Sequence, residues 1–212
     1  VRSIKGYFDD VSEVRMVKGD NIRNIKAGIF GVTIGERFLL LSGIDVDMRT
    51  PQFAYMDKQM KIVETAWGIY EPMPRSKEAD DLWMPFAAGY EKWKELHNSF
   101  VDIAQEKEKL LETGAKDDDP RVAELGDRLM KKYLEVRLAY IPLEGKIDEL
   151  LALNDKNTEI ANAAAGKSIA LTETIIIVTI VVGVLAALAL GLFLATSIVR
   201  ILNEVKRAAA QV

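Results

Sequence analysis

The stretch TIIIVTIVVGVLAALALGLFLATSIV, residues 174–199, runs for 26 residues without a charged side chain. As an α-helix rising 1.5 Å per residue it measures about 39 Å, which exceeds the ~30 Å hydrocarbon core of a bilayer. A helix buried in a soluble protein rarely lacks charge on every face over such a length. The stretch is therefore predicted to cross a membrane, with residues 1–173 on one side and residues 200–212 on the other.

The charges that flank this span predict its orientation. Arg200, Lys206 and Arg207 follow the span, together with the single acid Glu204. An excess of Lys and Arg next to a span marks the cytoplasmic side. The chain has 28 basic and 32 acidic residues, so 25 basic and 31 acidic residues precede the span. We expect residues 1–173 to lie outside the cytoplasm and residues 200–212 to lie inside.

Composition excludes several kinds of site. The chain has no cysteine and a single histidine, His97, which rules out disulfides, thiolate or histidine-rich metal sites and covalent haem attachment. No nucleophile–base pair, metal-ligand cluster or phosphate-binding loop stands out. The acidic balance before the span gives no sign of nucleic-acid binding. We therefore expect no enzyme activity, catalytic residue, cofactor, metal or nucleic-acid partner.

Heptad spacing predicts four helices before the span. Residues 1–48 contain no proline and are predicted to form one helix, and a turn at Thr50–Pro51 is predicted to start the second helix. Pro72 and Pro74 end that helix, Ser76 caps a third, and the polar turn of residues 114–120 precedes a fourth. Because short turns make successive helices antiparallel neighbours, the predicted fold class is all-α: an antiparallel four-helix bundle continuing into a transmembrane helix.

The first helix carries two apolar stripes. The seam predicted to face the bundle core is Ile22, Ile25, Ile29, Val32, Glu36 and Leu39, and Ile4, Phe8 and Val11 extend it toward the N-terminus. The second stripe is Phe30, Ile34, Arg37, Leu41 and Ile44. A helix that is apolar on two faces is buried on two faces, so the second stripe predicts a homodimer through this helix. Three glycines, Gly28, Gly31 and Gly35, indicate that a neighbouring helix or a small ligand comes close.

The later helices continue the same spacing. The third is predicted to bury Leu82, Phe86, Gly89, Trp93, Leu96, Phe100, Ile103, Lys107 and Leu110, which leaves His97 at the surface or the core edge. The fourth keeps its rhythm from Val136 into the membrane, so one helix is expected to run from the outer domain through the bilayer. Beyond the span a seam resumes with Ile198, Leu202, Val205, Ala209 and Val212.

Two arginines form the candidate ligand site. If Val1 and Thr174 both lie near the outer membrane surface, Arg37 and Arg137 stand at the same height, about 55 Å up. Arg37 interrupts the second stripe, and Arg137 shares a helix face with Tyr133 and Tyr140. Guanidinium groups at an apolar interface fit carboxylates, so the four residues predict a small carboxylate or amino-acid ligand. The alternative is that Glu36 and Glu135 neutralise the arginines without any ligand.

The chain resembles the input region of bacterial methyl-accepting chemotaxis receptors with a four-helix-bundle sensor domain. The resemblance covers nearly the whole chain and rests mainly on architecture. The break between Tyr70 and Ser76 that leads into YEKWKELHNSFVDIA, residues 90–104, is similar to the junction of the second and third helices in such domains. The C-terminal SIVRILNEVKRAAAQV, residues 197–212, resembles the opening of a HAMP signal-relay module.

The resemblance implies a function in chemotaxis and divides the chain into three parts. Residues 1–173 would be the sensor in the bacterial periplasm, residues 174–199 the second transmembrane helix in the inner membrane, and residues 200–212 the start of a HAMP-like coiled coil. A first membrane helix would precede Val1, and a rod that controls a cytoplasmic kinase would follow Val212. In this family the ligand lies at the dimer interface, held by arginines of the first helix and groups of the fourth. The alternatives are the input region of a sensor histidine kinase or nucleotide cyclase, and a membrane-anchored structural coiled coil without a ligand.

Overall fold

A computed structural model describes Gly6 and residues 10–209 of the chain. The described residues form helices and no strands, which confirms the all-α class. The elements are the short π-helix η1 (Asp10–Arg15) and the α-helices α2 (Met16–Leu39), α3 (Val46–Tyr70), α4 (Lys77–Glu112) and α5 (Pro120–Ala209). The chain divides into two compact units: Asp9–Ile160 holds the bundle, and the second contains α5 from Ala161 onward.

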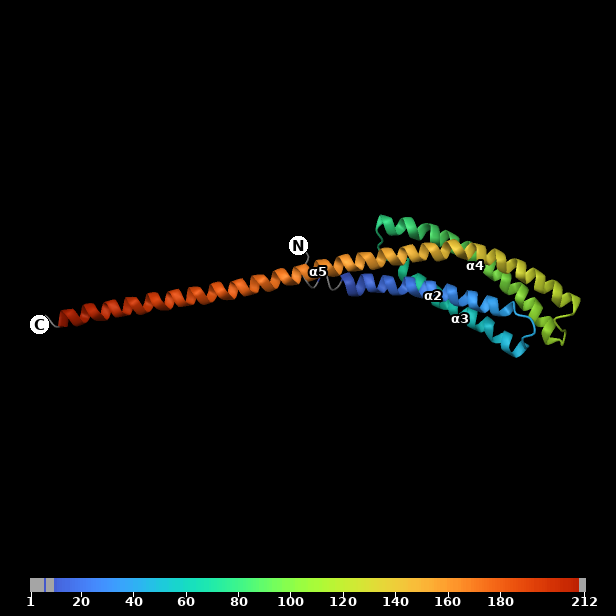
Figure 1. Cartoon of the computed structure of the whole chain (residues 1–212), viewed down its shortest axis with the longest axis horizontal. Coiled ribbons are helices and arrows are strands. Elements are labelled where there is room, and N and C mark those ends of the chain that lie inside the picture. The colour runs from blue at the N-terminus through green and yellow to red at the C-terminus, as the bar shows by residue number, and fades with distance from the viewer. Residues whose placement is uncertain (1–5, 7–9, 210–212) are drawn as a thin grey trace. The chain divides into compact units, whose positions relative to one another are not determined.

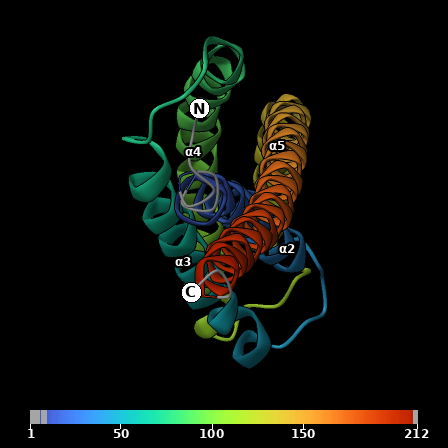
Figure 2. The ribbon, with the colours of Figure 1, turned by 90° about the vertical axis from the view of Figure 1, so that its left-hand side faces the viewer.

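The bundle is antiparallel, with successive helices running in opposite directions (Figure 1). In the end-on view of Figure 2, α2 and α4 occupy opposite corners, and so do α3 and α5. Ion pairs connect neighbouring corners. Lys26 on α2 bonds Asp148 on α5, and Lys94 on α4 lies 3.1 Å from Glu64 on α3. Arg128 on α5 pairs with Glu106 on α4, and Gly28 on α2 lies against Val63 on α3. Each helix therefore contacts two neighbours around one shared core.

The core contains the whole predicted seam of α2 from Ile22 to Leu39. Each of the seam's six residues, Glu36 included, is at most 2% exposed. The α5 side of the core follows the predicted 4-3 rhythm and comprises Val136, Tyr140, Leu143, Ile147 and Leu150. Of the proposed extension of the α2 seam, Ile4 and Phe8 lie outside the described residues, and Val11 lies half-buried in η1.

The buried face of α4 is rotated from the predicted one. Phe86, Trp93 and Phe100 are buried as expected. The residues between them in the core are Trp83, Tyr90 and His97, while Leu82 and Leu96 pack at the core edge. The predicted and the observed 4-3 patterns on α4 share Phe86, Trp93 and Phe100. The observed pattern also buries the rings of Trp83 and Tyr90, where the predicted one has Leu82 and Gly89. The prediction that His97 lies at the surface or core edge was wrong, because it is 4% exposed.

The first helix ends nine residues earlier than predicted. α2 stops at Leu39, and the turn of residues 40–45 contains Gly43 with φ +71°, a backbone conformation that favours glycine. Leu41 and Ile44 therefore lie in this turn and do not continue a helical stripe. The predicted turn at Thr50–Pro51 was also wrong, because Pro51 lies inside α3.

A buried arginine on α3 fixes this early turn. Arg49 donates from Nη2 to the Leu39 carbonyl at 2.9 Å and from Nη1 to the Leu41 carbonyl at 2.8 Å. Its Nε donates to Glu108 Oε2 on α4 at 2.9 Å, and both side chains are almost fully buried. The last carbonyls of a helix have no partner within the helix. Arg49 supplies partners for this end of α2.

The three glycines of α2 allow a neighbouring helix, α3, to approach closely. A close helix was one of the two reasons predicted for these glycines, and a small ligand was the other. A Cβ on Gly28 would lie 2.5 Å from Val63 Cγ2 and 3.0 Å from the Gln59 backbone oxygen. Gly31 faces the Gln59 side chain and Gly35 faces Met56 in the same way. The backbones of α2 and α3 therefore approach more closely than side chains on α2 would allow.

The other two helix starts match the sequence. Ser76 Oγ accepts from the Ala79 backbone N–H at 3.2 Å, which is the predicted cap of α4. At the start of α5, Asp119 Oδ1 accepts from the Arg121 backbone N–H at 2.9 Å, and Gly114 takes φ +88° in the preceding turn.

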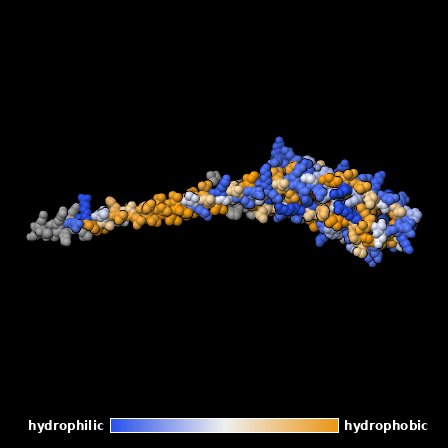
Figure 3. Space-filling view, viewed as in Figure 1, coloured by the Kyte–Doolittle hydropathy of each residue, from blue (hydrophilic) through white to orange (hydrophobic). Residues whose placement is uncertain are grey.

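Helix α5 has no break between Pro120 and Ala209, so the predicted continuity of helical structure through residues 161–177 is confirmed. It is long and apolar enough to cross a membrane, and its most apolar stretch is not buried. Apolar side chains cover this segment in Figure 3. Of the seam predicted beyond the span, Leu202, Val205 and Ala209 are helical but their side chains are not among those described, and Val212 lies outside the described residues.

Candidate functional site

The surface between α2 and α5 carries exposed apolar side chains around two arginines. Helical spacing places Phe30, Ile34 and Arg37 on one flank of α2. It likewise places Met130, Leu134, Arg137 and Ile141 on one flank of α5. The five apolar side chains are between 43% and 54% exposed. We call these seven residues the α2–α5 face.

Arg37 and Tyr133, two of the predicted site residues, contact each other directly. Arg37 Nε donates to Tyr133 Oη at 2.9 Å across 96 residues of sequence. The Tyr133 ring is half-buried and packs against Phe100, with ring centroids 6.4 Å apart. The core thus holds Tyr133 in place, and Tyr133 orients the exposed Arg37 guanidinium.

Arg137 and Tyr140, the other two predicted site residues, form a second pair. Arg137 Cζ lies 5.0 Å from the centre of the Tyr140 ring, a cation–π geometry. Tyr140 is only 3% exposed, and its hydroxyl donates to Glu144 Oε1 at 3.2 Å. Burial raises the pKa of Tyr140 to about 12, so its hydroxyl stays protonated at neutral pH. Tyr140 is therefore a core residue, and the Arg137 guanidinium packs over its ring.

The structure brings the two pairs to the same level of the bundle. Arg37 bonds Tyr133, and Arg137 lies one helical turn further along α5 on the same side. This agrees with the equal height predicted for the two arginines. Tyr140 also lines a cavity with Lys26 and Glu144, but its volume of ≈ 10 Å³ leaves room for no more than about one water molecule.

The two glutamates expected to neutralise the arginines bond elsewhere. Glu36 Oε1 pairs with His97 Nδ1 at 2.7 Å in the core. Glu135 Oε2 accepts from Lys132 at 2.6 Å. Within residues 10–209, no carboxylate lies within ion-pair distance of Arg37 or Arg137. Both guanidinium groups thus keep donors available for an anion from outside the chain.

The Glu36–His97 pair is a feature that sequence reasoning missed. Burial raises the pKa of Glu36, while the hydrogen bond from His97 and the nearby Arg37 charge oppose that shift. The His97 ring stacks on Trp93 with centroids 5.5 Å apart. A signal was present, because Glu36 occupies a seam position where an apolar residue is usual, and a buried carboxylate needs a partner.

No group of three or more His, Cys, Asp or Glu residues that could hold a metal occurs in the part of the chain that the structure describes. At the α2–α5 face, two arginines held by tyrosine contacts lie among exposed apolar side chains.

Comparison with known proteins gives one structural likeness. No protein-family model and no curated protein matches the chain. A solved structure described as the periplasmic sensor domain of a sensor histidine kinase matches with a TM-score of 0.43 at 13% identity, covering 73% of this chain and 94% of its own. A likeness of this extent shows neither a family nor an activity for the chain.

Proposed function

We propose that this chain is the sensor region of a dimeric transmembrane receptor, of the chemoreceptor type, that binds a small carboxylate outside the cytoplasm. The observation that carries this proposal is the α2–α5 face, where Arg37 and Arg137 lie among exposed apolar side chains and have no carboxylate partner within residues 10–209. Such a face is stabilised by a second apolar surface, and its cations are stabilised by an anion.

The apolar segment of α5 supports membrane attachment. Its side chains are exposed along the whole length, with Ile175 64%, Leu188 59% and Leu192 67% exposed. Burying them in hydrocarbon removes that apolar surface from water. The basic residues after the segment favour a cytoplasmic C-terminal side and a periplasmic bundle. An output through cytoplasmic kinase-coupling machinery follows from the chemoreceptor proposal, and a histidine kinase or nucleotide cyclase output is the alternative.

Two copies are proposed to pair through the α2–α5 face. In a two-fold dimer the same patch of each protomer faces its copy. Phe30 and Ile34 would then pack against their counterparts, with Met130, Leu134 and Ile141 at the border. Each Arg37 approaches the dimer axis, so the two protomers together form one cationic site.

Disulfide crosslinking tests the dimer. The chain has no cysteine, so Ile34→Cys introduces the only thiol. We expect this variant to form an intersubunit disulfide rapidly in native membranes, because the two-fold axis brings the two copies of position 34 close together. The matched control is Asp57→Cys, which is exposed on α3 at the same level, since Gly35 faces Met56. Equal crosslinking of both variants would contradict pairing through this face.

Calorimetry tests the carboxylate site. The full chain in detergent micelles is titrated with a panel of mono- and dicarboxylates and amino acids. We expect Arg37→Ala and Arg137→Ala each to weaken the binding of the tightest carboxylate by about 10-fold or more, since each variant removes a charge-assisted hydrogen bond. Arg128→Ala, an exposed arginine of α5 that pairs with Glu106, is the control and should bind like the parent. Unchanged affinity in both site variants would place the ligand elsewhere.

Signal transmission is proposed to run along α5. Residues 120–209 are helical throughout, and helix shifts at interfaces are typically about 1–2 Å. The ligand must bind the two signalling states with different affinity for such a shift to occur. We expect four glycines inserted after Ala164 to leave ligand affinity intact but to abolish ligand-dependent output of the full-length receptor. An alanine insertion of the same length keeps the helix and is the control. Normal signalling by the glycine variant would exclude the helical relay.

A further inference from the structure

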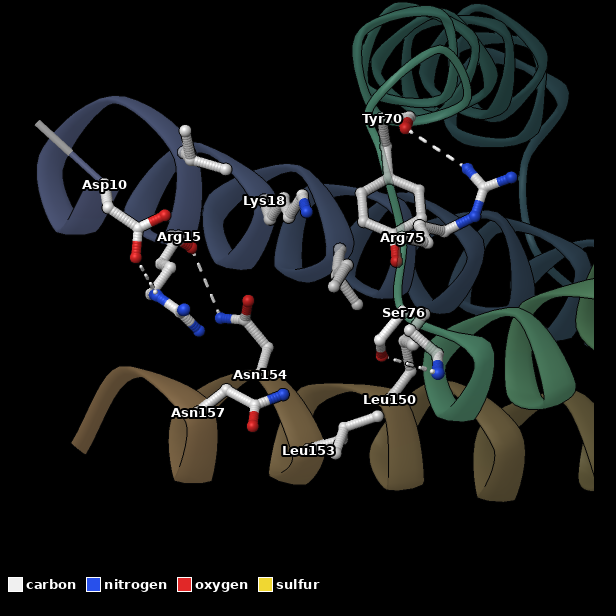
Figure 4. A pocket seen from close by; sticks show the side chains of 13 residues that line it. Asp10, Arg15, Lys18, Tyr70, Arg75, Ser76, Leu150, Leu153, Asn154 and Asn157 are labelled. Atoms are coloured by element: carbon white, nitrogen blue, oxygen red, sulfur yellow. Dashed lines mark hydrogen bonds and ion pairs between the residues drawn. The ribbon is translucent and has the colours of Figure 1, made fainter. Parts of the chain in front are cut away.

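A second, separate cavity lies at the other end of the bundle (Figure 4). It is enclosed by η1 and the start of α2, the end of α3 with the connection to α4, and the stretch of α5 from Leu150 to Asn157. Its volume is ≈ 290 Å³, close to the lower end of the range of small-molecule pockets. Lys18 lies 19 residues from Arg37 along α2, or about 28 Å. The cavity is therefore distinct from the α2–α5 face.

Three cations from three parts of the chain line this cavity. Arg15 Nε donates to Asp10 Oδ2 at 2.8 Å, and Arg75 Nε donates to Asp80 Oδ1 at 2.7 Å. Lys18 Nζ donates to the backbone carbonyl of Pro74, which carries no charge. Within the described residues, no carboxylate lies within ion-pair distance of Lys18. The two arginines are thus neutralised, and one positive charge remains at Lys18.

The surroundings make this lysine charge unfavourable without an anion. Burial lowers the pKa of Lys18, and the nearby Arg15 and Arg75 charges lower it further, while Asp10 opposes the shift. Burial also raises the pKa of Tyr70, another lining residue, to about 12, so its neutral phenol contributes no compensating charge. A bound anion would relieve the repulsion among the three cations.

Neutral hydrogen-bond donors complete the polar part of the cavity. The half-buried Asn157 amide has no hydrogen-bond partner among the described residues, and Figure 4 shows its side chain among the lining groups. Ser76 Oγ accepts from the Ala79 N–H, and its own O–H has no acceptor among the described residues. The Asn154 amide is already engaged, since its Nδ2 donates to the Arg15 carbonyl at 3.3 Å. The free Asn157 and Ser76 donors suit the oxygens of an acid group.

The rest of the lining is apolar. Ile22, Leu150 and Leu153 are each at most 7% exposed and contribute aliphatic surface, with Val14 and Ala79 beside them. Inorganic anions have no group that gains from contact with this surface. The combination of one uncompensated cation, free neutral donors and an apolar wall fits a molecule with one negative charge and a short hydrocarbon body.

We propose that this cavity is a binding site for a small organic monocarboxylate, whose acid group contacts Lys18 and Asn157 and whose hydrocarbon part packs on Ile22, Leu150 and Leu153. Because these groups come from α2 and α5, and Lys18 also bonds the α3–α4 connection, the bound anion joins all three segments. Occupancy therefore tightens this end of the bundle independently of the α2–α5 face.

Binding of defined anions to the full chain in detergent micelles tests the site. The probes are butyrate, benzoate, succinate and inorganic phosphate, measured by calorimetry and by the shift in melting temperature. We expect butyrate or benzoate to bind and to raise the melting temperature, with succinate and phosphate at least about 10-fold weaker, because a second charge meets no second cation. Absence of monocarboxylate binding, or tighter binding of phosphate, would overturn the proposal.

Four variants assign the binding to this cavity. Lys18→Met removes the charge and should weaken binding by about 10-fold or more, whereas Lys109→Met, an exposed lysine of α4, should have no effect. Asn157→Asp places a negative charge in the cavity while keeping the side chain's shape, and should also weaken binding because this charge repels the anion. This variant tests the site even if Lys18→Met folds poorly. Arg37→Ala should leave this binding unchanged, which separates it from the α2–α5 face. Equal affinities for the parent, Lys18→Met and Asn157→Asp would exclude the site.

Discussion

Replacing Arg49 by alanine is expected to lower the free energy of unfolding by about 3–5 kcal/mol, because breaking a buried ion pair leaves an uncompensated charge in the core. The charge left behind is Glu108, which is 4% exposed and whose second oxygen, Oε1, has no hydrogen-bond partner in the described part of the chain. The carbonyls of Leu39 and Leu41 lose their donors in the same substitution. Thermal melting of the chain in micelles, followed by circular dichroism, measures the effect.

Two further variants make the Arg49 prediction specific. Arg128→Ala removes the exposed pair of Arg128 with Glu106, which also joins α4 and α5, and should cost less than about 1 kcal/mol. The double substitution Arg49→Met with Glu108→Met removes both buried charges and should recover a large part of the loss, since apolar replacement of a buried pair is often neutral. If Arg49→Ala melts no lower than Arg128→Ala, the buried pair does not hold this end of the bundle together.

Replacing Gly28 by alanine is expected to destabilise the bundle by about 1–3 kcal/mol, although alanine favours helix more than glycine does. The added Cβ would lie 2.5 Å from Val63 Cγ2 and 3.0 Å from a backbone oxygen of Gln59. A side-chain methyl can rotate away, but a backbone oxygen moves only if the whole of α3 shifts. The close approach of the α2 and α3 backbones at this point therefore depends on this glycine.

Gly68→Ala is the matched control for Gly28→Ala. Gly68 also lies in a helix, α3, but a Cβ there would meet nothing within 4 Å. We expect this variant to be more stable than the parent by up to about 1 kcal/mol, because alanine gains helix propensity at no steric cost. Melting temperatures that move in the same direction for both substitutions would contradict the close packing of α2 on α3.

The sequence by itself predicted the features that depend on local spacing. The uncharged run of residues 174–199 identified the apolar segment of α5, and heptad spacing identified the buried seam of α2 from Ile22 to Leu39. Ser76 as the cap of α4 was also predicted, since a cap is formed by residues only three apart. Such patterns repeat within one helix, so no knowledge of the neighbouring helices is needed to find them.

The candidate site could be predicted in part. Arg37 and Arg137 were selected by counting residues along the first and fourth helices from the membrane. In the structure Arg37 bonds Tyr133, and Arg137 lies one helical turn from Tyr133 along α5. Their tyrosine contacts differ from each other, however. Tyr133 bonds Arg37 from the other helix, and Tyr140 is a core residue under Arg137. The packing of the whole bundle decides which side of α5 faces α2. The spacing of residues within α5 does not contain this information.

Only the tertiary structure decided the features that join distant residues. The end of α2 at Leu39 depends on Arg49 of the next helix and on Glu108, 59 residues further along the chain. His97 is buried because Glu36, 61 residues away, lies opposite it. The cavity at Lys18 combines groups of η1, α2, the α3–α4 connection and α5. A spacing rule describes one helix face, whereas hydrogen bonds and ion pairs between helices depend on how far each helix is rotated and shifted against its neighbours.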